Sequence, residues 1–349
     1  MESVEWGCKT LQPVLTFDAI DFLTLPCEVG TWAVPSRHGE ERDAAAVVAM
    51  GVFDGLHLGH RALLEQAKRE ARAEGTRFVV VTFDPDPSDV VSSSTPARHL
   101  LYGDDRVRGL LGLGADAVLV IRFTPDLSSL APETFVRDVL MHELRPTAVH
   151  VGENFRFGYR ARGTTETLEE LGHAYGFSVR AHGLVEGDGG PVSATRIRAL
   201  LERGDLDMAN DLLRRCHYVR GRVEHGRGEG TSFGFPTANV RCKSTVCMPA
   251  EGVYGCYVTF GRKRWPAAVN VGAPPTFTDG GDSTQGTFLE ANLVGFDGDL
   301  YGADVAVSFV AWLRGSKVFE SIDELERTVL GNIAWVRANL GEGELEVHP

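Results

Sequence analysis

The sequence predicts an α/β domain with a mostly parallel sheet, followed by a small antiparallel β-barrel or sandwich that ends in a helix. The chain has 349 residues, which exceeds what one compact core usually covers, so two domains are expected. From residue 44 to about residue 200, apolar strand-like runs alternate with helical patterns, as in a parallel sheet with helices on both faces. Beyond that, short strand-like segments separated by Gly, Pro and Asp favour an antiparallel barrel or sandwich.

The first domain is expected to repeat strand, helix, strand. AAAVVAM at 44–50 has the composition of a buried strand, and the helix predicted over 61–74 places Leu63, Leu64, Ala67 and Ala71 on one face. Further strands are predicted at 77–83, 116–123 and 147–152, with helices around Glu133 to His142 and Thr167 to Tyr175.

The second domain is expected to consist of short strands and one closing helix. The helix predicted over 321–340 carries a stripe that we interpret as core packing, formed by Ile322, Leu325, Val329, Ile333, Val336 and Leu340. Strands are predicted at 217–224, 252–260, 264–272, 286–294 and 303–312. The resulting domain prediction is an N-terminal extension of unknown role at 1–43, the α/β domain at 44–200, a helical linker at 201–215 and the β domain at 216–349.

Composition narrows the class of protein. With 43% hydrophobic and 24% charged residues the chain has the composition of a globular protein, and its net charge of -13 argues against a general nucleic-acid binder. The six cysteines form no CxxC pair, so reduced buried thiols are expected rather than a zinc or redox site. No uninterrupted apolar run reaches membrane length. We therefore expect a cytoplasmic protein with no nucleic-acid and no membrane partner.

The segment GVFDGLHLGH at 51–60 lies between the first predicted strand and the first predicted helix. Glycines let its backbone approach a polyphosphate closely, at the positive end of a helix dipole. His57 and His60 are three residues apart, so both imidazoles can point at the same phosphate oxygens and stabilise charge that develops during transfer at phosphorus. Isolated histidines in a turn would carry no function, but their place between strand and helix favours a phosphate site.

This segment resembles the signature of the HxGH nucleotidyltransferase superfamily, and its FDG variant resembles prokaryotic FAD synthetase. TFDPDP at 82–87, GENFRFGYRARG at 152–163 and VSATRIR at 192–198 are similar to other blocks of that family. The resemblance implies a Rossmann-like nucleotidyltransferase domain that adenylylates FMN, with His57 and His60 as catalytic residues. It also implies that ATP or flavin is bound by Gly51, Phe53, Asp54, Gly59, Asn154, Ser193, Thr195 and Arg196.

A second candidate site begins at GFPTANV, residues 234–240. Thr237 and Asn239 are two apart on a segment expected to be extended, so their oxygens project to the same side. Hard oxygen ligands of this kind suit Mg²⁺. Taken alone, the PTAN tetrapeptide is also compatible with an ordinary turn.

The blocks GFPTAN, GVYGCYV, NVGAPPTF, FLEANLVGFDGDLYG and FVAWLRGSKVFESIDEL resemble, in order, the riboflavin kinase domain. With the N-terminal blocks the likeness covers about residues 45 to 340. It implies that Thr237 and Asn239 bind the metal and the ATP phosphates, and that Glu290 is the catalytic base for the ribityl hydroxyl. Gly234, Phe235 and Pro236 complete the implied ATP and flavin site of this half.

The resemblance therefore predicts a bifunctional enzyme that phosphorylates riboflavin to FMN and adenylylates FMN to FAD, with ATP as co-substrate and Mg²⁺ as cofactor. Two alternatives stay open: a paralogue with one active half or a flavin-analogue substrate, and a non-catalytic flavin or nucleotide sensor. The oligomeric state is not predicted. The sequence departs from the family pattern at Asp86, Ala194, Thr231, Asn292 and Gly295.

Overall fold

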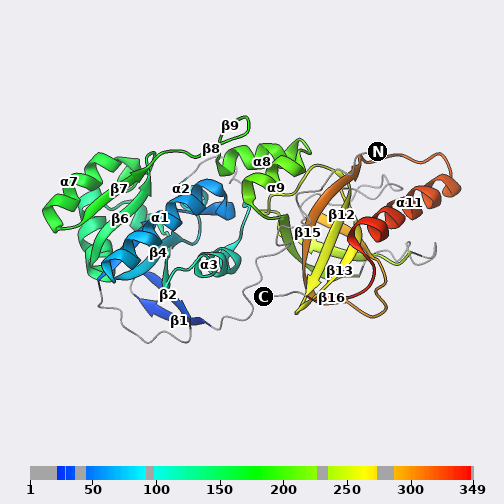
Figure 1. Cartoon of the computed structure of the whole chain (residues 1–349), viewed down its shortest axis with the longest axis horizontal. Coiled ribbons are helices and arrows are strands. Elements are labelled where there is room, and N and C mark those ends of the chain that lie inside the picture. The colour runs from blue at the N-terminus through cyan, green and yellow to red at the C-terminus, as the bar shows by residue number, and fades with distance from the viewer. Residues whose placement is uncertain are drawn as a thin grey trace. The chain divides into compact units, whose positions relative to one another are not determined.

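The computed structural model describes residues 22–27, 29–35, 45–91, 98–225, 235–272 and 287–346 (Figure 1). The chain divides into two compact units, one holding Phe17–Ala194 and the other Thr195–Pro349. Most of the predicted extension at 1–43, together with Gly234 and Thr231, lies outside the described residues. Each unit is described by itself below.

The first unit is built on a seven-stranded sheet in the order β1-β2-β5-β4-β3-β6-β7. Strands β3 to β7 pair with one another in parallel, whereas β1 pairs with β2, and β2 with β5, in the antiparallel direction. The central strand β3 is wholly buried, and its sequence AVVAM is apolar without alternation, as expected for a strand covered on both faces. The strands span Phe22–Cys27 (β1), Gly30–Pro35 (β2), Ala46–Met50 (β3), Arg77–Phe83 (β4), Ala117–Ile121 (β5), Pro146–Gly152 (β6) and Ser178–His182 (β7).

Helices cover both faces of this sheet, which confirms the predicted α/β architecture (Figure 1). Helix α1 begins at Leu58, three residues before the predicted start, because His57 caps it. The helix predicted around 133–142 is instead a short α-turn, a π-helical segment (η3) and a second α-turn. The helical elements are η2 (Asp54–Leu56), α1 (Leu58–Glu74), α2 (Pro87–Val91), α3 (Gly103–Gly112), α4 (Pro125–Ser128), α5 (Pro132–Phe135), η3 (Val136–Met141), α6 (His142–Leu144), η4 (Tyr159–Ala161) and α7 (Thr165–Tyr175), with a small hairpin of β8 (Glu186–Gly187) and β9 (Gly190–Pro191).

The second unit is a closed antiparallel barrel with a terminal helix, as predicted. Its strands follow the order β12-β15-β10-β11-β14-β13, and β13 pairs with β12 to close the ring. Asn210 on α9 ties two strands together, because its amide donates to the Phe309 carbonyl (3.1 Å) and accepts from the His217 amide (2.6 Å). The elements are α8 (Ala194–Glu202), α9 (Leu206–Leu213), β10 (His217–Glu224), β11 (Ala238–Cys242), β12 (Gly252–Phe260), β13 (Lys263–Val271), β14 (Thr287–Leu293), β15 (Asp304–Arg314), α11 (Ile322–Leu340) and β16 (Leu345–Glu346).

The predicted core stripe of the terminal helix is only partly correct. Val336 and Leu340 are buried, whereas Ile322 is 62% exposed and Leu325 and Val329 are half-buried. The C-terminal half of α11 packs on the barrel in a cluster with Cys216, Ala268 and Val310. The helical spacing of apolar residues therefore identified the helix correctly and overestimated how much of it is covered.

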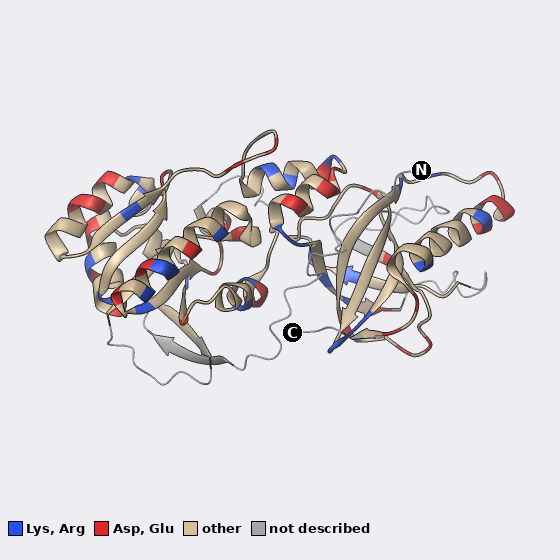
Figure 2. Cartoon of the chain, in the orientation of Figure 1, with Lys and Arg blue, Asp and Glu red and all other residues tan. Residues whose placement is uncertain are grey.

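The state of the cysteines agrees only in part with the prediction. Cys242, Cys247 and Cys256 are free and buried, as expected, whereas Cys216 is disulfide-bonded, contrary to the expectation of reduced thiols. Among the described residues, no helix combines the length and apolarity needed to cross a membrane. Acidic and basic residues are interspersed along α1 and α11 (Figure 2).

Candidate active sites

The first candidate site is the loop between β3 and α1. Asp54 in this loop is 3% exposed, and its carboxylate accepts hydrogen bonds from the backbone amides of Leu100 (2.9 Å) and Leu101 (2.8 Å). This carboxylate ties the loop to the segment that precedes α3. Asp54 is the one predicted residue of the 51–60 segment that does not line the adjoining cavity.

The two histidines of the loop form a stacked pair. Their ring centroids are 3.6 Å apart with an interplanar angle of 18°. His57 is the N-cap of α1, and its Nδ1 accepts from the His60 backbone amide (3.4 Å), so a neutral His57 carries its proton on Nε2. A Cβ on Gly59 would lie 3.2 Å from the His57 ring, so a glycine between the histidines leaves room for the stack.

The electrostatics around His60 favour an anion. Burial lowers the pKa of His60 well below 6.5, and the nearby His57 and Arg106 lower it further. Arg106 is 3% exposed, and its guanidinium donates to the Phe83 carbonyl. The stacked imidazoles therefore lie in the positive potential of this guanidinium, at the N-terminus of a helix of 17 residues.

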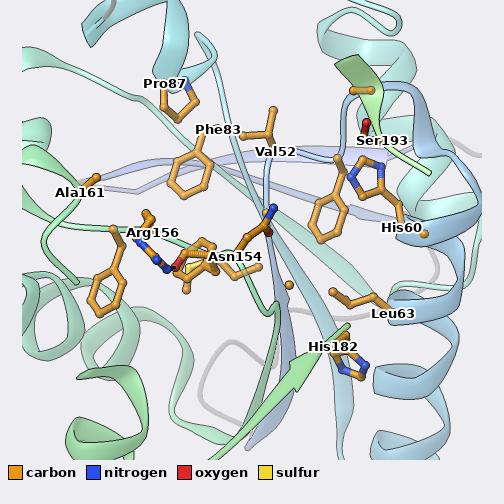
Figure 3. Close-up of a pocket in the computed structure, with 18 of the residues that line it drawn as sticks. Val52, His60, Leu63, Phe83, Pro87, Asn154, Arg156, Ala161, His182 and Ser193 are labelled. Atoms are coloured by element: carbon orange, nitrogen blue, oxygen red, sulfur yellow. Dashed lines mark hydrogen bonds between the residues drawn. The ribbon is translucent and has the colours of Figure 1, made fainter. Parts of the chain in front are cut away.

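A cavity of about 860 Å³ lies beside this loop (Figure 3). Its walls include residues that follow β3, β4, β6 and β7, at the carboxyl edge of the parallel strands. Because β3 pairs with β4 on one side and with β6 on the other, this is the switch point where ligands of open α/β sheets bind. The predicted residues that line the cavity are Gly51, Phe53, His57, Gly59, His60, Asn154 and Ser193.

The cavity has an aromatic side and a polar side. Phe155 and Phe157 stack with centroids 5.7 Å apart, and Phe83 meets Phe123 edge to face at 5.9 Å. In Figure 3, Arg156 and Ala161 lie on one side of the cavity, and His60 and Ser193 lie on the other. A cavity of this kind fits a flat aromatic ring at one end and a phosphate chain at the other.

Some predicted residues and departures lie elsewhere. Thr195 and Arg196 open α8 and belong to the second unit. Asp86 does not line the cavity, and its carboxylate accepts from the backbone amide (2.9 Å) and the hydroxyl (2.8 Å) of Ser88 at the start of α2. Ala194 does line the cavity.

The second candidate site is a row of polar residues across the barrel. In the strand register, Asn239 on β11 lies directly opposite Glu290 on β14, and Glu290 lies opposite Asn270 on β13. Residues paired in this way point to the same face of the sheet. Val240, Leu289 and Val271 alternate with them and are buried, so the polar row lies on the outer face of the barrel. Thr237 is two residues before Asn239, and it is half-buried.

Two departures from the family pattern have clear structural roles here. Asn292 donates from Nδ2 to the Pro236 carbonyl (2.9 Å), which holds the segment before β11 against β14. Gly295 has φ +79, and a Cβ there would lie 2.7 Å from the Gly343 backbone nitrogen, so glycine is required. Phe235 is buried beside this segment, and Pro236 is exposed.

Sequence reasoning missed two groups of site residues. The aromatic wall of the cavity comes from segments far apart in the chain, although Phe155 and Phe157 belong to the GENFRFG block that was recognised. Asn270, from the block NVGAPPTF, has a buried Nδ2 with no hydrogen-bond partner among the described residues. Its place opposite Glu290 follows only from the strand register.

Comparison with known proteins gives matches in both units. The family model for FAD synthetase matches residues 39–196, and the model for riboflavin kinase matches residues 213–340. A bifunctional riboflavin kinase/FMN adenylyltransferase from Pseudomonas fluorescens is 36% identical over 84% of this chain and 92% of its own length. Proteins of the same name from Escherichia coli (strain K12) and Bacillus subtilis (strain 168) are 34% and 30% identical, over 81% and 83% of this chain and 89% and 91% of theirs. A crystal structure of a macrolide-efflux protein from Streptococcus pneumoniae superposes with a TM-score of 0.75 and 28% identity, covering 86% of this chain and 95% of that one.

Proposed function

The chain belongs to the bifunctional riboflavin kinase/FMN adenylyltransferase family and is a transferase, and from this premise we propose which residues carry its two reactions. The kinase half converts riboflavin and ATP to FMN and ADP. The adenylyltransferase half converts FMN and ATP to FAD and pyrophosphate. The single observation that carries the residue assignment is that each predicted reactive group has its predicted neighbours beside it, His57 with His60 and Glu290 with Asn239.

For adenylyl transfer, we assign FMN to the aromatic side of the cavity and ATP to the side of the stacked histidines. An FMN phosphate oxygen attacks the α-phosphorus of ATP, and the bond to the departing pyrophosphate breaks. His57 and His60 donate hydrogen bonds to the phosphate oxygens, where negative charge grows during this step, and the N-terminus of α1 adds its dipole. The stack and the cap hold both rings in place before substrate binds, so little reorganisation is needed.

Thr195 and Arg196 are proposed to hold ATP phosphates, as the family resemblance implies. An arginine fork matches phosphate geometry well. Ser193, which lines the cavity, adds a hydroxyl donor, and Asn154 contacts the ligand from the loop after β6. Gly51, Phe53 and Gly59 form the wall next to the histidines.

For phosphorylation, Glu290 is the proposed base. It accepts the proton of the terminal ribityl hydroxyl, whose oxygen then bonds to the γ-phosphorus of ATP while ADP leaves. Asn270 lies opposite Glu290 with a buried amide nitrogen, and it is suited to orient the carboxylate. Gly234, Phe235 and Pro236 lead into the segment that presents Thr237, which Asn292 holds in place.

The donor set beside Glu290 fits Mg²⁺. Thr237 and Asn239 offer hydroxyl and amide oxygens, which together with phosphate oxygens are the hard ligands that this ion prefers. Among the described residues, no group of three or more His, Cys, Asp or Glu side chains is placed to hold a metal. We therefore propose no metal site made of protein ligands alone. When bound, Mg²⁺ neutralises phosphate charge, and Thr237 and Asn239 are the residues proposed to hold it.

Product analysis of the purified chain tests this assignment and its alternatives. Incubation with riboflavin, ATP and Mg²⁺, followed by chromatography, is expected to show FMN first and FAD later. FMN without FAD, or FAD only when FMN is supplied, would indicate a paralogue with one active half. Flavin binding without ATP consumption would indicate a sensor. A cytoplasmic location stays a prediction from the sequence.

A further inference from the structure

Three titratable side chains from three different elements form a continuous chain of contacts in the first unit. His150 on β6 is 2% exposed, and its Nδ1 lies 2.8 Å from Nε2 of His182 at the end of β7. Its other ring nitrogen, Nε2, lies 3.0 Å from Oε2 of Glu70 on α1. The chain therefore runs from Glu70 through His150 to His182. None of the three residues belongs to the motifs that the two reactions use.

Glu70 decides which ring nitrogen carries the proton in His150 and then in His182. A carboxylate only accepts, so the 3.0 Å contact between Glu70 Oε2 and His150 Nε2 favours a proton on Nε2, although its angle lies outside the hydrogen-bond range. Burial lowers the pKa of His150 to about 4, so the ring is neutral at physiological pH and its Nδ1 is an acceptor. His182 must then donate from Nε2. Burial also lowers the pKa of His182, so this ring is neutral too, and its Nδ1 is left as an acceptor.

His182 faces the cavity (Figure 3). Its Nδ1 has no partner in the described part of the chain, since the contact with His150 uses Nε2. In Figure 3, His182 lies below Leu63 and His60 lies above it, both on the α1 side of the cavity and away from Arg156 and Ala161. This is the side that the proposed function assigns to ATP.

We propose that His182 recognises the base of the nucleotide, accepting a hydrogen bond at Nδ1 from the exocyclic amine of adenine. Glu70 and His150 are positioning residues that hold His182 in the tautomer with an accepting Nδ1. Guanine carries a carbonyl where adenine carries this amine, so an accepting nitrogen discriminates against GTP. The inference rests on the proposed adenylyl transfer and adds its nucleotide selectivity.

The other charged residues nearby do not interrupt the contacts between Glu70, His150 and His182. Arg180 on β7 is half exposed and pairs with the other Glu70 oxygen (2.9 Å), so it does not compete for the oxygen that contacts His150. Glu153, after β6, accepts from the Leu184 backbone amide (3.4 Å). Its own amide donates to the His182 carbonyl (2.8 Å), which fixes the backbone that carries the ring.

The test compares ATP and GTP as substrates of the purified full chain at saturating FMN, with pyrophosphate release as the readout. His182→Phe removes the acceptor, and its kcat/KM for ATP should fall about ten- to hundredfold while that for GTP changes little. His182→Asn retains an oxygen at the position of Nδ1 and should keep most of the ATP preference. In Glu70→Gln the amide can donate as well as accept, so His150 and His182 are no longer held in one tautomer. The ratio of kcat/KM for ATP to that for GTP should therefore fall by an intermediate amount.

Arg180→Gln is the matched control, because it removes the other partner of Glu70 and leaves the contacts from Glu70 through His150 to His182 intact. The ATP to GTP ratio should therefore stay at its wild-type value. Riboflavin phosphorylation by the same preparations reports folding. Should His182→Phe lose that activity as well, His182→Asn and Glu70→Gln provide the readout. An unchanged ATP to GTP ratio in His182→Phe and Glu70→Gln, or an equal loss for both nucleotides, overturns the proposal. A wild-type chain that releases no pyrophosphate from FMN and ATP contradicts the proposed function itself.

Discussion

The two candidate sites are built in opposite ways. The first is a cavity at the carboxyl edge of a parallel sheet, and its walls come from many loops around one rigid pair of stacked histidines. The second is a row of polar residues on the outer face of an antiparallel barrel, where strand register alone brings Asn239, Glu290 and Asn270 together. In the first site burial lowers the pKa of His60, and in the second site strand pairing sets the positions of the polar residues.

This difference predicts that the largest effect of a single substitution falls on proton transfer in the barrel. Glu290→Gln keeps the shape of the side chain and removes the base, so riboflavin phosphorylation should fall about 10²- to 10⁴-fold. FAD formation from supplied FMN should be unchanged. Steady-state rates of the two reactions with one preparation check this, and retention of FMN formation in the variant would show that Glu290 is not the base.

Substitution of the capping histidine should have the next largest effect. His57→Ala removes one donor to the transferring phosphate and the cap of α1, so kcat for FAD formation should fall about 10²- to 10³-fold. His57→Asn restores a capping acceptor without the imidazole. If the two variants were equally active and near wild type, the imidazole would have no role in transfer. A rescue by Asn alone would show that His57 acts only by capping α1.

The buried carboxylate of the loop should affect stability more than chemistry. Asp54→Ala leaves the amides of Leu100 and Leu101 without their acceptor, which should destabilise the first unit by roughly 2–4 kcal/mol. Asp54→Asn retains one acceptor oxygen and should lose less than half of that. Urea unfolding of both variants measures the difference, and equal stability of Asp54→Ala and wild type would contradict the role of the tether.

The stability of the barrel should depend on pH because of one buried histidine, His217. His217 is fully buried with Nε2 2.7 Å from the Cys247 carbonyl, and burial, with Arg215 nearby, lowers its pKa to about 3. Because this pKa lies below the unfolded value of about 6.5, the unfolded chain binds more protons between these values. Stability should therefore be fully present above pH 6.5 and fall by about 1.4 kcal/mol per pH unit below it.

Urea titrations of the barrel transition at several pH values measure this slope. His217→Gln keeps an amide donor for the Cys247 carbonyl and does not titrate, so its profile should be flatter than that of the wild type. Parallel profiles for the two proteins would mean that other groups dominate the acid response.

The parts of the fold with strong local signals were predictable from sequence. The apolar strands β3, β4 and β6 and the helix α1 lie where their patterns placed them, within a few residues. Strand β7 was not predicted, because SVRAH is polar and partly exposed. The strand β2 was not predicted either, although Trp32 within it is buried against the first core. Tertiary pairing, rather than local pattern, makes these two segments strands.

The candidate sites were predictable to the extent that they are contiguous in sequence. The stacked histidines come from one motif, whereas the aromatic wall and His182 are brought to the cavity by the order of strands. Asp54 belongs to the same motif, and no local pattern distinguishes its tethering of Leu100 and Leu101 from a ligand contact.

Mixing two inactivated chains tests most directly the claim that the sites act separately. His57→Ala should convert riboflavin to FMN and stop there, and Glu290→Ala should leave riboflavin unchanged. The account predicts that an equimolar mixture of the two variants forms FAD from riboflavin, because each supplies the half that the other lacks. Formation of FAD by either variant alone as fast as by the mixture, or its absence from the mixture while FMN accumulates, would contradict the account.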